Sequence, residues 1–310
     1  MKTFLLVDGH ALIHRAYFAI PPFKTKDGFP TNAIYGFFTI LQKAIKDFNP
    51  LFLTILYDTP KPTFRNKLYK SYQIQRPKTQ DDMKVQIPKL KEILDTGNVY
   101  QLEMEGFEAD DIIGTITTQT NDKDLKKVIL TGDKDIFQLV NSSTYVMTPQ
   151  IGFNNAILYD EEQVIKKLKI LPQLIPDYKA LAGDPSDNYP GAKGIGPKTA
   201  ANLINEYKSV ENLYKNINII KNERVKKILL DQKANVFISK ELAVIKKDVK
   251  INFDFNKSKF TGFNNKIKDE LLSLGMKGLV SRLFNNKVKQ TNPEIQKTQK
   301  TNDEQQINLF

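Results

Sequence analysis

Short apolar runs alternate with longer amphipathic stretches along the first half of the chain. Three runs rich in β-branched and aromatic residues, at residues 4–7, 52–57 and 128–131, predict strands. Between them lie three stretches with helical periodicity, at residues 33–48, 81–96 and 109–120. Strands that alternate with helices predict an α/β fold with a mostly parallel central sheet flanked by helices.

Each predicted strand leads into at least one aspartate. The first run is followed by Asp8, the second by Asp58, and the third by Asp133 and Asp135. In open parallel sheets, ligands bind beyond the carboxyl ends of the strands. These four side chains are therefore expected to converge on one crevice.

Two further acidic motifs raise the number of candidate carboxylates to nine. Glu108, Asp110 and Asp111 begin the third predicted helix, while Asp184 and Asp187 lie in a turn-rich stretch. Each motif alone has an ordinary explanation, as a partner of the helix dipole or as a turn. The nine carboxylates together need another explanation, because two carboxylates ~4 Å apart repel by about 4 kcal/mol at an effective dielectric of ~20. Such crowding predicts cations among them.

The composition limits which cations these carboxylates can bind. The chain has no cysteine and only two histidines, His10 and His14. Disulfides and thiolate metal sites are therefore excluded. Carboxylate ligands favour hard ions such as Mg²⁺, with Mn²⁺ as a substitute.

The net charge suggests a polyanionic partner. The formal charge is +11, from 46 basic and 35 acidic side chains. Setting the nine candidate ligands aside leaves 26 acidic residues against the 46 basic ones. An acidic centre in a basic surface is typical of a two-metal nuclease, in which the surface binds the phosphodiester backbone.

The chain divides into three parts by composition. Residues 1–170 are expected to form the α/β catalytic domain, with a basic, tyrosine-containing arch at about 64–91. Residues 171–284 read as a helical, lysine-rich domain, and residues 285–310 as a disordered polar tail. No apolar run approaches the ~18 residues of a membrane span. We expect a cytoplasmic, nucleoid-associated protein without membrane contact.

Seven motifs, in a fixed order over residues 1–284, resemble the 5′→3′ exonuclease domain of bacterial DNA polymerase I, a relative of the flap endonucleases. They lie at residues 6–10, 28–37, 64–65, 106–111, 131–135, 183–188 and 194–200. The resemblance implies a nuclease domain with a helical arch and a C-terminal helix-hairpin-helix (H3TH) DNA-binding region.

The resemblance also implies roles for the nine carboxylates. A first metal cluster would contain Asp8, Asp58, Glu108, Asp110 and Asp111. Asp133 would bridge to a second cluster that includes Asp135, Asp184 and Asp187. The first cluster and Asp133 would carry the catalysis, with two or more Mg²⁺ ions in each active site.

Residues 64–78 resemble the helical arch or clamp through which a single-stranded 5′ end passes. The resemblance implies that Arg65 and Arg76 contact phosphates and that Tyr69 or Tyr72 stacks on a base.

The arch departs from the family pattern at one position. The family usually has lysine directly after the tyrosine at position 72, and this chain has Gln73. Lys70 or Lys67 is expected to supply the missing charge.

Residues 194–200 resemble a helix-hairpin-helix element that binds duplex DNA. Gly194 and Gly196 would let the backbone approach a phosphate, with Lys198 and Thr199 beside it. In the family this element often binds a K⁺ ion as well.

The implied activity is 5′→3′ exonuclease and 5′-flap endonuclease action on flaps, nicked or gapped duplexes, 5′ ends and RNA–DNA primer junctions, in primer removal and repair. We expect a monomeric, stand-alone nuclease, since no polymerase domain follows.

One alternative is a non-catalytic DNA-junction binder, which nine intact carboxylates argue against. Another is an RNA-cleaving nuclease, which the helical part and residues 194–200 disfavour.

The C-terminus carries a short pattern of its own. Gln306, Leu309 and Phe310 resemble the peptide by which bacterial replication proteins dock on the sliding clamp. The alternative is a chance apolar end on a disordered tail.

Overall fold

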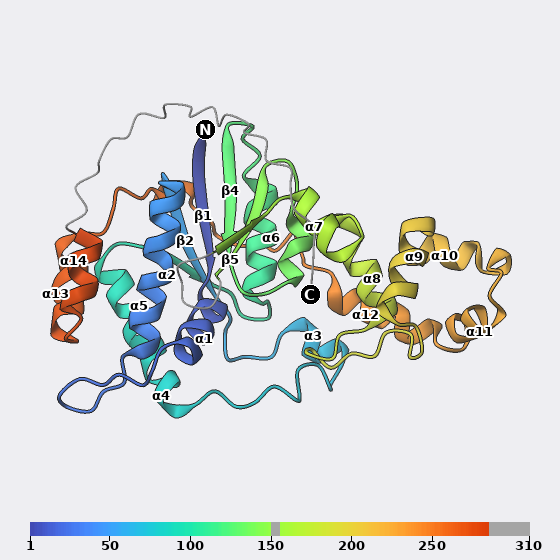
Figure 1. The fold of residues 1–310 in the computed structure, drawn as a ribbon, viewed down its shortest axis with the longest axis horizontal. Coiled ribbons are helices and arrows are strands. Elements are labelled where there is room, and N and C mark those ends of the chain that lie inside the picture. The colour runs from blue at the N-terminus through green and yellow to red at the C-terminus, as the bar shows by residue number, and fades with distance from the viewer. Residues whose placement is uncertain (150–155, 285–310) are drawn as a thin grey trace, which may run out of the picture.

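The computed structural model describes residues 1–149 and 156–284 (Figure 1). Its centre is a six-stranded sheet with the strand order β3-β2-β1-β4-β5-β6. The strands are β1 (Lys2–Asp8), β2 (Phe52–Tyr57), β3 (Tyr100–Glu103), β4 (Leu125–Leu130), β5 (Thr144–Pro149) and β6 (Ala156–Tyr159). All neighbouring strands pair in parallel except β6, which is antiparallel to β5. The predicted α/β fold with a mostly parallel sheet is confirmed.

Helices cover both faces of this sheet. Those of the N-terminal part are α1 (Gly9–Ala19), α2 (Asn32–Phe48), α3 (Phe64–Leu68), α4 (Asp81–Lys84), α5 (Gln86–Thr96), α6 (Ala109–Gln119) and α7 (Glu161–Leu168). The single helix predicted at residues 81–96 is divided between α4 and α5. Pro88 explains the break, because it has no N–H to donate to the Lys84 carbonyl one turn earlier.

The central strand β1 contributes side chains to two separate hydrophobic cores. Leu5 and Val7 pack on one face with side chains of α2, α5 and the C-terminal helices. Phe4 and Leu6 pack on the other face with side chains of α6 and α7. A strand buried on both faces has no polar alternation, which is why an apolar run marked it in the sequence.

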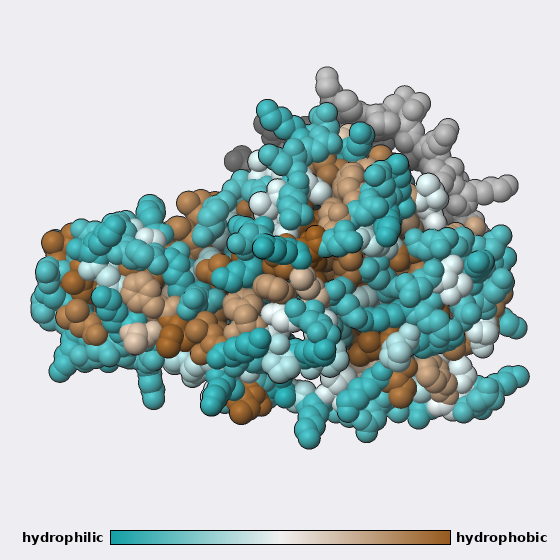
Figure 2. All heavy atoms as spheres, turned by 180° about the vertical axis from the view of Figure 1, so that it is seen from behind, coloured by the Kyte–Doolittle hydropathy of each residue, from teal (hydrophilic) through white to brown (hydrophobic). Residues whose placement is uncertain are grey.

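The C-terminal part is helical. Its elements are α8 (Ile175–Ala182), α9 (Pro197–Tyr207), α10 (Val210–Lys215), α11 (Glu223–Asp231), α12 (Lys233–Ala243), α13 (Asn265–Ser273) and α14 (Lys277–Phe284). Helices α8 to α12 share a third core, and α9 to α11 project from the sheet-containing body (Figure 1). Seen from behind, hydrophilic residues cover most of the surface of both parts (Figure 2). Among the described residues, no helix is long and apolar enough to cross a membrane.

The segment between α3 and α4 passes beyond the carboxyl ends of the strands, along the lower edge in Figure 1. Helix α3 has five residues, turns follow at residues 70–75, and the chain then extends into α4. This placement puts the predicted arch next to the crevice where the strand-end aspartates meet.

Candidate metal centre

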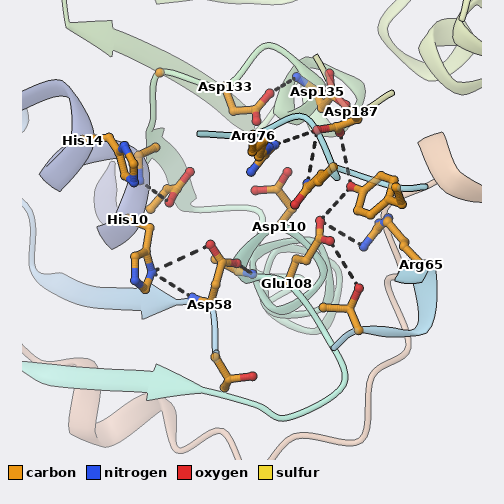
Figure 3. Close-up of a pocket in the computed structure, with 18 of the residues that line it drawn as sticks. His10, His14, Asp58, Arg65, Arg76, Glu108, Asp110, Asp133, Asp135 and Asp187 are labelled. Carbon is orange, nitrogen blue, oxygen red and sulfur yellow. Dashed lines mark hydrogen bonds and ion pairs between the residues drawn. The ribbon is translucent and has the colours of Figure 1, made fainter. Parts of the chain in front are cut away.

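A cleft of about 1060 Å³ opens beyond the carboxyl ends of the central strands. Seven of the nine predicted carboxylates line it, and they are Asp8, Asp58, Glu108, Asp110, Asp133, Asp135 and Asp187. Figure 3 shows the labelled ones pointing toward one another from several different elements. The convergence expected from the strand ends is therefore present in the structure.

Asp8 is fixed at the point where β1 becomes α1. Its Oδ1 accepts a hydrogen bond from the Ala11 N–H at 3.0 Å and so caps the helix. Its Oδ2 accepts from the Thr131 hydroxyl at 2.8 Å. Gly9 permits this abrupt turn, because a Cβ there would lie 2.3 Å from the Tyr57 ring.

Asp58 connects the end of β2 to two helices. Its Oδ1 accepts from the Ala109 N–H at 2.7 Å, at the start of α6. Its own N–H donates to Nδ1 of His10 at 3.1 Å. Glu108 caps α6 from the same side, so the fold holds Asp58 and Glu108 at adjacent positions in the cleft.

We call Asp8, Asp58, Glu108, Asp110 and Asp133 the inner cluster. Burial and the Asp58 charge raise the pKa of Asp8 to about 7, and burial raises that of Glu108 to about 7. The pKa of Asp110 is well above its usual value through burial and the neighbouring Asp133. Within residues 1–149 and 156–284, Arg65 near Glu108 is the one Lys or Arg within ion-pair distance of this cluster. The cluster therefore has oxygen ligands in excess of protein cations, a donor set that fits divalent ions such as Mg²⁺.

We call Asp135, Asp184 and Asp187 the outer cluster. One carboxylate oxygen from each lies within 4.8 Å of the others, close enough to share a metal ion. Unlike the inner cluster, it has two protein cations in contact, Lys179 on Asp135 and Asp184, and Arg76 on Asp187. Asp184 is 8% exposed and is absent from the cleft lining, but it lines a second, smaller pocket.

The structure corrects two of the predicted roles, those of Arg65 and Asp111. Arg65 is 2% exposed, and its guanidinium donates to both carboxylate oxygens of Asp111 at 2.7 and 2.9 Å. It also donates to the carbonyls of Leu242 and Val244. Arg65 borders the cleft, but these four acceptor oxygens hold its guanidinium within the protein instead of exposing it to a phosphate. Asp111, fully buried against it, lies outside the cleft lining. The pair joins the arch base to the helical part.

Tyr72 also differs from its expected role. It is 4% exposed, and its hydroxyl lies 3.2 Å from both Glu108 Oε2 and Asp187 Oδ2. It therefore holds carboxylates of the two clusters and cannot stack on a base. Beside it, Gln73 donates from Nε2 to Asp187 Oδ1 at 3.2 Å, so the residue that replaces the family lysine also binds this carboxylate.

The other arch residues remain accessible. Arg76 lines the cleft with its side chain 51% exposed and is 2.7 Å from Asp187 Oδ1. Lys67 and Lys70 are exposed and Tyr69 is half-buried, all outside the cleft lining.

The predicted helix-hairpin-helix residues lie in the C-terminal helical part, away from the cleft. Gly194 has a φ of +106°, a left-handed conformation that favours glycine, and Gly196 caps α9. Gly194, Gly196 and Lys198 are exposed and Thr199 is partly so. Gln306, Leu309 and Phe310 lie outside the described residues.

No role was predicted from the sequence for three residues that lie near the clusters. His10 and His14 face the cleft from α1, and burial lowers the pKa of each, which favours their neutral forms (Figure 3). Their spacing of one helical turn could have indicated that both side chains lie on the same face of a helix. For Lys179, the nearness of Asp184, five positions on, was a weak signal, whereas the contact with Asp135 spans 44 positions.

The mostly parallel sheet and the carboxylates at its strand ends define an α/β protein with an acidic cluster that could bind metal ions. Residues 3–169 match the family "5′-3′ exonuclease, N-terminal resolvase-like domain", and residues 170–266 match "5′-3′ exonuclease, C-terminal SAM fold". The chain belongs to the 5′-3′ exonuclease family, which confirms the predicted resemblance and the nuclease class.

Relatives include both short and long proteins. The chain is 41% identical over 286 residues to a 5′-3′ exonuclease of Aquifex aeolicus, covering 91% of this chain and 96% of that protein. It is 36% identical over 283 residues to DNA polymerase I of Bacillus subtilis, covering 91% of this chain but 32% of the polymerase. The chain thus spans about a third of the polymerase relative.

Solved structures share the fold at low sequence identity. T5 5′-exonuclease with bound divalent metal ions (zinc) matches with a TM-score of 0.64 and 18% identity, over 91% of this chain and 97% of that one. The catalytic core of Rad2 in complex with DNA substrate matches with a TM-score of 0.59 and 18% identity, over 91% of each chain.

Proposed function

We propose that this protein is a 5′→3′ exonuclease and 5′-flap endonuclease that hydrolyses DNA with divalent metal ions. The observation that carries the proposal is the inner cluster. It gathers five carboxylates in an open cleft and leaves most of their charge without a protein cation. Family membership supports the same activity.

The two clusters would hold one ion each, Mg²⁺ in the cell and Mn²⁺ as a substitute. Asp133 would link them: its Oδ1 accepts from the Asp135 N–H at 2.8 Å, and after burial its charge is the next cause that raises the pKa values of Asp110 and Asp135. Bound divalent ions would supply Lewis acidity and activate water for attack on the phosphodiester. The carboxylates would orient this chemistry, and Tyr72 would keep Glu108 and Asp187 at a fixed separation.

Arg76 is our candidate for binding the phosphate beside the cleft. It is half-exposed at the lining, and its guanidinium can exchange Asp187 for a phosphate oxygen when DNA enters. Tyr69 and Lys70 would follow the single strand along the arch. Arg76 thereby takes the role that the family gives to the lysine absent at Gln73.

The exposed start of α9 would bind the downstream duplex, with Lys198 on a phosphate and K⁺ at the neighbouring carbonyls. Lys198→Ala should weaken duplex binding equally for all sequences and reduce the salt slope by about 1. Glu206→Ala, at the other end of α9, is the control. An altered base preference with an unchanged salt slope would contradict a phosphate contact.

A labelled 5′-flap duplex tests the proposed activity. We expect cleavage near the junction with Mg²⁺, no cleavage with EDTA, and none by Asp110→Asn, while Asp110→Asn still binds the flap. The same flap made of RNA tests the primer junction as a substrate. Metal-independent cleavage, or full activity of Asp110→Asn, would refute the proposal.

Docking of Gln306, Leu309 and Phe310 on the sliding clamp stays a prediction, as do the monomeric state and the nucleoid location. Deleting residues 306–310 should leave cleavage of free flap DNA unchanged and remove binding to the clamp. A shortened protein that still co-elutes with the clamp would exclude this role.

A further inference from the structure

Lys179 brings a protein cation into the outer cluster. It lies on α8, and its Nζ contacts Asp135 and, at 2.5 Å, Oδ2 of Asp184. The side chain is 14% exposed, so it does not sample partners in solvent as a surface lysine does. Its ammonium sits against two of the three carboxylates that could share a metal ion.

The surrounding backbone holds this arrangement in place. Helix α8 packs against α12 and against the short 3₁₀ helix that begins at Asp135. Asp184 exchanges two backbone hydrogen bonds with Tyr189, at 2.9 and 3.1 Å. Its Oδ1 accepts from both the N–H and the hydroxyl of Ser186. Asp184 therefore cannot swing away from Lys179 to meet an ion elsewhere.

We propose that Lys179 is the resting counter-cation of the outer cluster, and that a divalent ion binds there only by displacing its ammonium. This inference rests on the proposed metal-dependent function. One ammonium and one metal ion compete for the same carboxylates, Asp135 and Asp184, so the outer ion binds more weakly than the inner one. Lys179 is a positioning residue: it keeps the outer cluster assembled without metal and sets the metal concentration at which the second ion enters.

Tyr189 offers the displaced ammonium an acceptor inside the protein. Its side chain is 3% exposed, and its hydroxyl has no hydrogen-bond partner among the described residues. The backbone of Tyr189 is hydrogen-bonded to Asp184, which Lys179 contacts. In this proposal the buried hydroxyl is the acceptor that the ammonium would reach when an ion displaces it.

Binding of Mn²⁺ to the full chain without DNA, followed by calorimetry, tests the inference. Lys179→Met should tighten the weaker Mn²⁺ site on the order of tenfold or more, because a positive charge leaves the vicinity of the ion. Lys179→Arg should keep the weak affinity of the original protein. The Mg²⁺ concentration for half-maximal cleavage should fall in Lys179→Met.

Lys240→Met is the matched control. Lys240 also bridges two carboxylates, Asp177 at 2.7 Å and Glu211 at 2.6 Å, and is 22% exposed, but it lies outside the cleft lining and both clusters. Its replacement should leave both Mn²⁺ affinities unchanged.

An unchanged or weaker second Mn²⁺ site in Lys179→Met would overturn the inference. If that variant does not fold, Lys179→Gln removes the charge while retaining a hydrogen-bond donor, and the same outcomes apply. Failure of the proposed function looks different: the original protein would bind no Mn²⁺ and would not cut a 5′ flap.

Discussion

The inner and outer clusters lie next to each other and use the same carboxylate chemistry, but different charges surround them. Four members of the inner cluster have no Lys or Arg within ion-pair distance among the described residues, whereas each member of the outer cluster contacts Lys179 or Arg76. A cluster whose charge the protein already balances in large part, here with two cations for three carboxylates, can assemble without metal. One whose charge is unbalanced depends on metal and tolerates the loss of a ligand poorly.

The largest effect on activity should come from removing one inner ligand. Asp110→Asn keeps the size of the side chain but removes a charge, so cleavage of a flap should slow on the order of 10³-fold or more. Single-turnover rates at saturating Mg²⁺ measure this, with DNA affinity in EDTA as the control. Near-normal rates would mean that the inner cluster is not the metal centre.

Breaking the buried Arg65–Asp111 pair should mainly affect stability. Arg65→Met leaves the Asp111 carboxylate buried with one cation fewer, and should lower the free energy of unfolding by about 3–5 kcal/mol. Arg76→Met is the matched control, since its ion pair is half-exposed and should contribute less than about 1 kcal/mol. Urea unfolding without metal compares them, and equal losses would restore Arg65 as a candidate DNA contact.

An outer ligand should matter less than an inner one. Asp184→Ala should slow cleavage roughly 10- to 100-fold at low Mg²⁺ and recover at high Mg²⁺, because Asp135 and Asp187 remain as ligands. A Mg²⁺ titration of the cleavage rate shows the recovery. If Asp184→Ala is as inactive as Asp110→Asn at high Mg²⁺, the two clusters do not differ as described.

The smallest effect concerns pH. The pKa values of Asp8 and Glu108 are raised to about 7, so the folded protein keeps protons that the unfolded chain has lost. Stability of the metal-free protein should therefore fall as pH rises from about 4 to about 7 and level off above that. Melting temperatures should show this fall, and Mg²⁺ should stabilise more at about pH 8 than at about pH 5. Asp8→Asn should flatten the profile, and a steeper one would contradict the assignment.

Sequence patterns were sufficient to predict a strand where both of its faces are buried. Strand β2 was predicted with its observed bounds, because burial on both faces leaves a continuous apolar run. Strands β3, β5 and β6 were missed, and β3 is short, with no fully buried residue to mark it. The convergence of the strand-end carboxylates followed from the topology of parallel sheets.

The sequence did not predict which charged side chains would pair with each other. Arg65 meets Asp111 across 46 positions, and Lys179 meets Asp135 across 44. Such contacts depend on how helices pack and leave no local periodicity. An arginine in a basic arch therefore looked like a phosphate contact, although the fold buries it.

The order in which the two clusters fill with metal tests the comparison most directly. Crystals soaked in increasing Mn²⁺, without DNA, would reveal each ion by its anomalous scattering. We predict a peak among Asp8, Asp110 and Asp133 at lower Mn²⁺ than any peak among Asp135, Asp184 and Asp187. A first peak in the outer cluster, or none near Asp110 at any concentration, would contradict the account.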